Sequence, residues 1–179
     1  PKVLNTGDLQ IVKSDGISIE IPASSASNDT KSSTVASSSS KAGSAIAIAA
    51  AINSVIGTTG VQATANPALI NATKTTVGTT SIQTDLFVNG TKVSLSLTAG
   101  QTVGERRQYV IDSINAGTSV HGVTAGDGGN GGLSLKTVDG RNLSVWYDKS
   151  AVNGSDFGLG LNTATSSDPA GVTGVASAT

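Results

Sequence analysis

The sequence predicts an α+β fold in which mainly antiparallel β hairpins pack on two amphipathic helices. Three features support this fold class: turn dipeptides between alternating apolar runs, two segments with helical spacing of apolar residues, and a recurrence of this order along the chain. Hydrophobic residues make up 37% of the 179 residues and aromatic residues only 3%. We therefore expect a folded chain whose core consists of Val, Ile, Leu and Ala.

The first predicted hairpin joins residues 9–12 to residues 17–21, where apolar and polar residues alternate. Asp15 and Gly16 lie between these strands, and an Asp-Gly pair suits a type I′ turn because both of its central residues need a positive φ. Residues 23–40 hold almost no large apolar side chain. Such a segment cannot offset the entropy of ordering, so we expect an exposed, mobile loop there.

A helix is predicted over residues 41–56, because apolar residues recur there at spacings of three and four. Gly57 follows it, at a place where helices commonly end in a left-handed residue. The apolar stripe of this helix comprises Ala45, Ile48, Ala49, Ile52, Val55 and Ile56. Residues 60–65 alternate again and are predicted to form a return strand.

Two further hairpins are predicted at an Asn-Gly and an Asp-Gly pair, the dipeptides that best fit two-residue turns. The first covers residues 82–88 and 92–97 around Asn89-Gly90, and the second covers residues 133–138 and 142–146 around Asp139-Gly140. A helix is expected after the first of them but not after the second.

This second helix is predicted to begin after Thr102, whose hydroxyl is placed to form a capping box with the carboxylate of Glu105. Gly117 is expected to end the helix, and residues 119–125 to form the return strand. The apolar face of the helix is predicted to hold Val103, Val110, Ile111 and Ile114.

One hairpin, one helix and one return strand form a unit that we expect to occur twice. The first unit is predicted to span residues 1–66, and the second, together with the third hairpin, residues 67–147. Residues 148–179 are rich in Gly, Ser and Thr and are expected to leave the domain as a tail or return linker. No targeting segment is recognisable, and we expect the sequence to be an excised part of a longer chain.

The composition argues against catalysis and against several kinds of partner. The chain has no Cys and a single His, which leaves too few residues for a thiolate site, a zinc site or a catalytic triad. A net charge of -1 provides no electrostatic basis for binding nucleic acid or an anionic membrane surface. We therefore expect no enzyme activity, cofactor, nucleic-acid partner or membrane partner.

Four groups of residues are candidate sites, and the sequence favours an ordinary structural role for each. His121 is expected to face solvent, and residues 126–132 to form a flexible hairpin connection rather than a phosphate or calcium loop. Residues 105–107 are expected to be a cap and a solvated helix face, with contact to a neighbouring domain as the alternative. Trp146 and Tyr147 are expected to pack in the core, with a binding platform as the alternative.

Two segments of the chain match each other: residues 51–54 align with 113–116, and residues 60–63 with 122–125. This repeated pattern resembles the flagellin hook IN motif, found in the central region of bacterial flagellins and in some filament cap and hook-associated proteins. The resemblance covers residues 41–161. The residues that carry it are Ile52, Asn53, Gly60 and Val61 in the first copy and Ile114, Asn115, Gly122 and Val123 in the second.

The resemblance implies a structural role, as a surface-exposed outer domain of the filament protein flagellin that is secreted and contributes to the motility filament, its surface and its antigenicity. The long terminal helices through which flagellins polymerise have no counterpart here, because no heptad pattern is sustained. The partners implied are other flagellin domains or subunits, and antibodies or host surface molecules. By itself the fragment is expected to be monomeric.

Two alternatives remain open on the sequence. The chain could belong to a filament cap or hook-associated protein, which the same motif allows. It could instead be an adhesin-like binding module that holds a host glycan or protein with Trp146, Tyr147 and nearby loops.

Overall fold

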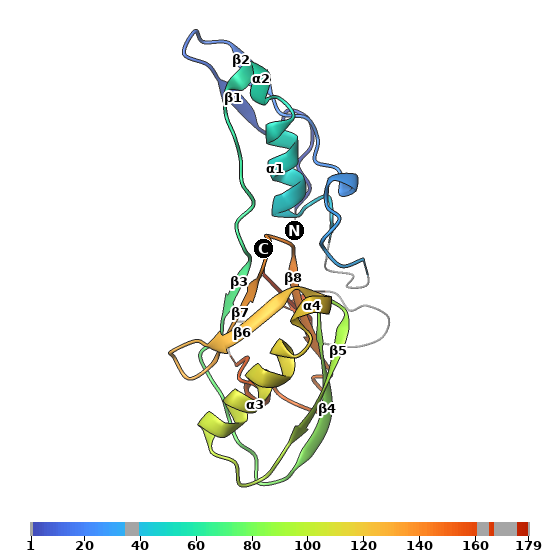
Figure 1. Cartoon of the computed structure of the whole chain (residues 1–179), viewed down its shortest axis with the longest axis vertical. Coiled ribbons are helices and arrows are strands. Elements are labelled where there is room, and N and C mark those ends of the chain that lie inside the picture. The colour runs from blue at the N-terminus through green and yellow to red at the C-terminus, as the bar shows by residue number, and fades with distance from the viewer. Residues whose placement is uncertain (1, 35–39, 161–164, 167–174, 179) are drawn as a thin grey trace.

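The computed structural model describes residues 2–34, 40–160, 165–166 and 175–178. It confirms the α+β class: antiparallel sheets are combined with a few helices. The molecule is elongated, with two lobes that follow one another along its long axis (Figure 1). We call residues 2–65 the N-terminal lobe and the remainder the sheet lobe.

The N-terminal lobe contains β1 (Gln10–Val12), β2 (Ser18–Glu20), the 3-10 helix η1 (Ala26–Asn28), α1 (Ala45–Asn53) and α2 (Ile56–Thr59). The strands of the sheet lobe are β3 (Leu69–Asn71), β4 (Ile82–Val88), β5 (Thr91–Leu97), β6 (Val123–Asp127), β7 (Leu133–Thr137), β8 (Leu143–Tyr147), β9 (Thr165–Ser166) and β10 (Val175–Ala178). Its helices are α3 (Val103–Asn115), α4 (Thr118–His121) and η2 (Gly154–Phe157).

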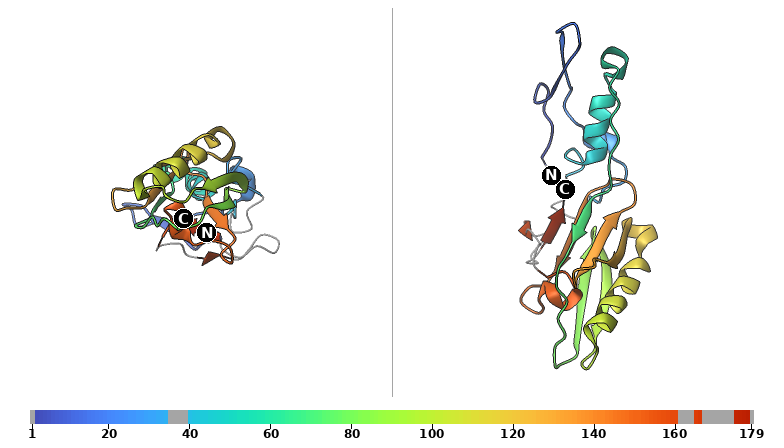
Figure 2. Two further views of the ribbon diagram at one scale, coloured as in Figure 1. Left: turned by 90° about the horizontal axis from the view of Figure 1, so that it is seen from below. Right: turned by 90° about the vertical axis from the view of Figure 1, so that its left-hand side faces the viewer.

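The sheet lobe is built from two antiparallel sheets and one long helix. One sheet has the order β5-β4-β8-β10-β9 and the other the order β3-β7-β6. Helix α3 contacts β5 and β6, which are edge strands of the two sheets, and lies along one side of the lobe (Figure 2). The core between these layers is aliphatic, as predicted, with Leu86, Leu95, Leu97, Val110, Ile114, Leu133, Leu135, Leu143, Val145 and Leu159 almost fully buried.

Helix α3 begins at the predicted capping box. The hydroxyl of Thr102 accepts from the Glu105 backbone at 3.2 Å, and the Glu105 carboxylate accepts from the Thr102 backbone at 2.8 Å. Val110, Ile111 and Ile114 face the core as expected, but Val103, in the first turn of α3, is 41% exposed.

Two of the three predicted hairpins are confirmed. β4 pairs with β5 along seven register positions, and Asn89 and Gly90 both have positive φ, of 48° and 81°, as a type I′ turn requires. β1 pairs with β2, but only Gly16 has positive φ in its turn. There the Gly16 N–H donates to the Lys13 carbonyl, so a type I turn is followed by a left-handed glycine.

The hairpin predicted at Asp139-Gly140 is wrong, because β7 and β8 belong to different sheets. β7 pairs with β3 and β6, whereas β8 pairs with β4 and β10, so both strands have their two neighbours already. The segment between them crosses from one sheet to the other. Gly140 does have a positive φ of 79°, and a Cβ atom there would lie 2.8 Å from the Cβ of Ala65. Position 140 therefore requires glycine, both because Ala65 lies so close and because φ is positive.

The first helix differs from its prediction in which face it buries. α1 buries Ala47 and Ala51 rather than the predicted stripe, and Ile48 and Ile52 line an open groove instead. Gly57 lies inside α2, and the left-handed residue that ends the helical segment is Gly60. Residues 60–65 form no strand.

The second helical segment ends in the same way, and Gly117 is not its left-handed residue. Gly117 has a φ of -101° and precedes α4, which Gly122 ends with a φ of 69°. Of the predicted return strand over residues 119–125, only the part from Val123 onward is extended.

Two segments expected to be loose are held by the fold. Phe157 and Leu159 are buried in the core and β10 pairs with β8, so the chain after residue 147 returns to the sheet lobe. Within residues 23–40, Asp29 and Ser32 are buried and hydrogen-bonded. Residues 35–39, 161–164, 167–174 and 179, which those two expectations also covered, lie outside the described residues.

The turn at Gly90 provides a test of the β4–β5 hairpin. Gly90→Ala forces a Cβ-bearing residue to a φ of 81°, which we expect to cost about 1 kcal/mol and to lower Tm by about 2–4 °C. Gly126→Ala is the matched control, because Gly126 has no positive φ and open space around its Cβ position. Thermal unfolding followed by circular dichroism checks both variants, and equal Tm losses would contradict this account of the turn.

Candidate functional site

The residues of the repeated motif make the same contacts in both copies. The side-chain amide of Asn53 donates to the Ala63 carbonyl at 2.9 Å and accepts from the Ala63 N–H at 2.7 Å. Asn115 does the same with Ala125, at 3.0 and 2.8 Å. Each Asn is the last residue of its helix and holds the backbone ten positions onward. We call this pair of bonds the asparagine clamp.

The chain between each Asn and its clamped Ala also follows the same path. A one-turn helix is closed by a bond from Gly60 N to Ile56 O of 2.7 Å in the first copy and from Gly122 N to Thr118 O of 2.8 Å in the second. Both glycines are left-handed, with φ of 68° and 69°. The clamp needs a donor and an acceptor on one short side chain, which only Asn supplies at this length.

The burial of the apolar residues of the motif differs between the two copies. Ile114 and Val123 are fully buried in the core of the sheet lobe. In the first copy, Val61 is 40% exposed, and Ile52 lines the groove between α1 and residues 140–142, which has a volume of about 630 Å³. The Asn and Gly residues of the motif therefore make the same backbone contacts in both copies. Its Ile and Val residues belong to a hydrophobic core only in the second copy.

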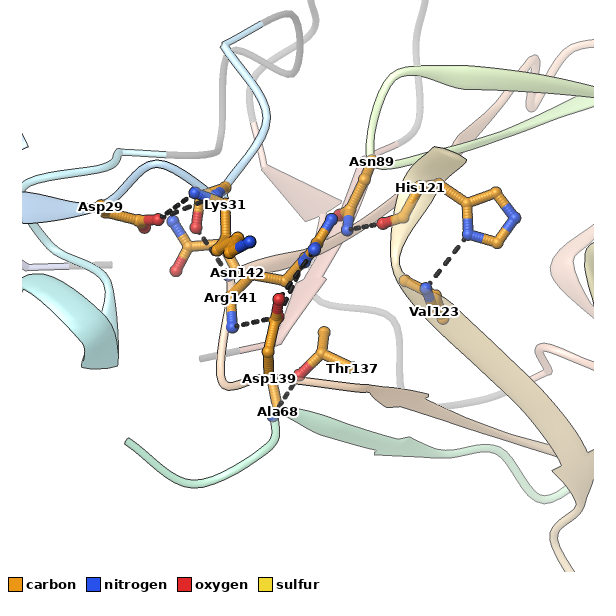
Figure 3. A network of polar contacts seen from close by, with 11 residues as sticks. Asp29, Lys31, Ala68, Asn89, His121, Val123, Thr137, Asp139, Arg141 and Asn142 are labelled. Atoms are coloured by element: carbon orange, nitrogen blue, oxygen red, sulfur yellow. Dashed lines mark hydrogen bonds and ion pairs between the residues drawn. The ribbon is translucent and has the colours of Figure 1, made fainter. Parts of the chain in front are cut away.

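His121 is buried rather than solvent-facing, with 2% of its surface exposed. Its Nε2 lies 3.0 Å from the carbonyl oxygen of Ile114, which can only accept, so Nε2 carries the proton. Its Nδ1 accepts from the Val123 N–H at 3.2 Å (Figure 3). The neutral ring is thus fully hydrogen-bonded. Burial, reinforced by the nearby Arg141 cation, lowers the pKa of His121 despite the bond to Ile114.

The glycine-rich connection at residues 126–132 is held by an ion pair. The Arg107 guanidinium donates twice to Asp127 Oδ2, at 3.1 and 2.9 Å, and Asp127 Oδ1 accepts from the Gly129 N–H at 2.9 Å. The Gly129 N–H and Arg107 lower the pKa of Asp127. Both carboxylate oxygens therefore have protein partners, so this loop is not built as a cation site.

Arg106 departs from the solvated helix face that the sequence predicts. Its side chain is fully buried, and its guanidinium donates to the Thr98 carbonyl at 2.7 Å and to Gln101 Oε1 at 3.3 Å. Its Nη1 has no hydrogen-bond partner among the described residues. These contacts fix the chain between β5 and α3.

Trp146 and Tyr147 pack in the fold, with only 7% and 3% of their surfaces exposed. Trp146 meets Phe87 edge to face at a centroid distance of 4.5 Å, and Tyr147 meets Phe157 at 5.0 Å. This confirms the core packing predicted for both rings. They do not form the exposed platform that a binding module would need.

A polar network joins the two lobes, and sequence reasoning missed it (Figure 3). The Asn142 N–H donates to the Ser32 hydroxyl at 2.9 Å, and the Asn142 side chain donates to the Ser40 carbonyl at 2.9 Å. Arg141 forms a bidentate pair with Asp139, at 2.8 and 2.7 Å, and lowers the pKa of that carboxyl. Because Ser32 and Asn142 lie 110 positions apart, no local pattern signals their contact.

These contacts order the backbone of the described residues. Among the described residues, no three His, Asp or Glu side chains gather where they could hold a metal ion. The helices of the same residues include none that is long and apolar enough to cross a membrane. No protein-family model matches the chain, and no curated protein matches it either.

The asparagine clamp predicts that replacing its Asn by Asp lowers the free energy of unfolding. In Asn115→Asp, the carboxylate still accepts from Ala125 N but repels the Ala125 carbonyl, so we expect a loss of about 1–2 kcal/mol in the free energy of unfolding at neutral pH. Denaturant unfolding measures this loss. Asn130→Asp, which makes the same change at an exposed residue whose side chain has no hydrogen bond within the described ranges, is the control and should shift stability by less than about 0.5 kcal/mol. Equal effects of the two variants would show that the clamp contributes nothing.

His121 predicts a loss of stability in mild acid. Since its pKa is lower in the folded chain, the unfolded chain takes up the proton more readily, so the stabilisation is complete above the ordinary pKa of about 6.5 and falls as pH decreases below it. The slope is at most about 1.4 kcal/mol per pH unit. Denaturant unfolding between about pH 7.5 and 5.5 measures it, a range in which no carboxylate at its ordinary pKa titrates. Because the chain has one His, His121→Gln should abolish this slope, and a slope that persisted would refute the assignment.

Proposed function

We propose that the chain is a structural domain, exposed on the outside of the bacterial flagellar filament as part of the filament protein flagellin. The observation that carries this proposal is the asparagine clamp at Asn53 and Asn115. These residues belong to the motif that resembles the flagellin hook IN repeat. Their contacts are those of a folding element used twice, which supports a structural role for the motif.

We infer that the building block is a hairpin, a helix and a return segment. The β1–β2 hairpin precedes α1 and the first clamp, and the β4–β5 hairpin precedes α3 and the second. The division at residue 66 follows this order. In the second copy the return segment is strand β6, whereas in the first copy it joins no strand and is held by the clamp.

Several properties of the surface fit an outer, secreted position. The molecule is long and narrow, and its charges are sparse and of mixed sign. Trp146, Tyr147 and Phe157 are buried and so leave little aromatic surface exposed. A domain of this kind adds bulk and surface identity to a filament without chemistry of its own. Its partners would be neighbouring flagellin domains or subunits, and antibodies or host molecules that meet the filament.

Immunogold electron microscopy of the source cells, with antibody against the purified chain, tests this proposal. We expect gold along the whole length of the flagella. Gold confined to filament tips or to the hook junction would instead assign the chain to a cap or hook-associated protein. Gold on the cell body away from flagella would overturn the flagellar assignment.

A further inference from the structure

We propose that Asn130 is a site of spontaneous deamidation in the folded protein, and that it reacts while the other Asn-Gly pairs of the chain are protected. The sequence holds such pairs at Asn89, Asn130 and Asn153. Deamidation begins when the side-chain carbonyl carbon of an Asn bonds to the backbone nitrogen of the next residue and closes a five-membered ring. An Asn followed by Gly is favourable because no side chain obstructs that approach. This inference does not rest on the flagellar assignment.

Asn89 is locked against this reaction by three hydrogen bonds. Its Oδ1 accepts from Ser144 N at 2.8 Å, its Nδ2 donates to the His121 carbonyl at 2.9 Å, and its backbone N–H donates to the Ser144 carbonyl at 2.7 Å. The residue is buried and fixed in a left-handed turn. Reaching the reactive geometry therefore requires opening of the β4–β8 contact.

Asn153 is exposed but held through its backbone and its neighbour. Its N–H donates to Asp156 Oδ2 at 2.9 Å, and its carbonyl accepts from the Asp156 N–H at 2.9 Å. Gly154 is wedged in place, since a Cβ atom on it would lie 2.7 Å from the Tyr147 hydroxyl and 2.9 Å from the Leu159 carbonyl. Ring closure at Asn153 therefore requires that its bonds to Asp156 open first.

Asn130 has none of these restraints. It is exposed, and within the described part of the chain neither its side chain nor the Gly131 N–H forms a hydrogen bond. Gly129 before it is left-handed with open space around it. Beyond it the loop is anchored, because the Gly131 carbonyl accepts from Thr75 Oγ1 at 2.6 Å. The free side chain and the free nitrogen thus lie next to each other in a loop whose ends are fixed.

The chemistry needs only water. The Gly131 nitrogen loses its proton and attacks the side-chain carbonyl carbon of Asn130, forming an N–C bond, and the side-chain amide leaves as ammonia. Water then opens the resulting five-membered imide at either carbonyl, which gives aspartate or isoaspartate. The product adds one negative charge to a chain of net charge -1, beside the Arg107–Asp127 ion pair.

The Asp-Gly pairs do not compete with Asn130 in forming an imide at neutral pH, because a nucleophile attacks an ionised carboxylate only poorly. Asp127, before Gly128, has its pKa lowered by the Gly129 N–H and by Arg107. Asp139, before Gly140, has its pKa lowered by Arg141. Asp15, before Gly16, has its pKa lowered by the Ile17 N–H and by Lys13. All three carboxyl groups therefore stay ionised well below neutral pH.

Peptide mapping by mass spectrometry after incubation in mildly alkaline buffer tests the proposal, with the folded chain compared against the chain unfolded in guanidinium chloride. In the folded chain we expect deamidation at Asn130 to exceed that at Asn89 and Asn153 by at least about tenfold, which corresponds to an opening cost of about 1.4 kcal/mol at the protected pairs. In the unfolded chain all three should react at similar rates.

Methyl transfer from labelled S-adenosylmethionine by an isoaspartate methyltransferase gives a second readout. Asn130→Gln should remove the isoaspartate that accumulates in the folded chain, and Asn153→Gln, a matched change at the other exposed pair, should leave it. Circular dichroism verifies that both variants fold. Folded-state rates that are equal at the three pairs, or a rate at Asn130 at least about tenfold below its unfolded-state rate, would overturn the proposal.

Discussion

Side-chain amides satisfy backbone groups at the places where the chain of this protein leaves a regular element, and much of the structure depends on this. After a helix ends, the following segment has N–H and C=O groups that need partners. Asn53 and Asn115 supply both partners at once for Ala63 and Ala125. In the first copy, where residues 60–65 join no sheet, the clamp supplies the bonds that a neighbouring strand would otherwise give to Ala63.

Asn89 extends the same device to the centre of the sheet lobe. Its amide joins the β4–β5 turn to Ser144 in β8 and to the carbonyl of His121 at the end of α4. His121 in turn receives the Val123 N–H and reaches back to Ile114 in α3. One polar chain thus connects both sheets and the helix, in a protein whose core is mainly aliphatic.

Some local signals predicted the structure correctly, whereas contacts between distant segments could not be predicted. Gly57 and Gly117, which are also local signals, do not end their helical segments. The capping box at Thr102 and the turn at Asn89-Gly90 involve residues within a few positions of each other, so the sequence contains the whole interaction. Asp139-Gly140 carries an equally strong turn signal, but pairing of β7 with β3 and β6 decides its strand partners. Tertiary contacts decide that Arg106 and His121 are buried. They also decide that α1 buries its alanines and not its isoleucines. The periodicity of the sequence gives no information on these contacts.

The path of the chain between the lobes also governs how they can move. Within the described residues, the covalent link between the lobes is the short stretch at residues 66–68, beside which Ala68 is bonded to Thr137. The bonds of Asn142 to Ser32 and Ser40 form a second, non-covalent tie. A sideways load on the outer end of the long molecule therefore falls on residues 66–68 and on the contacts that residues 139–142 make with the N-terminal lobe. The orientation of one lobe relative to the other thus depends on a small region near the middle of the molecule, and not on either sheet.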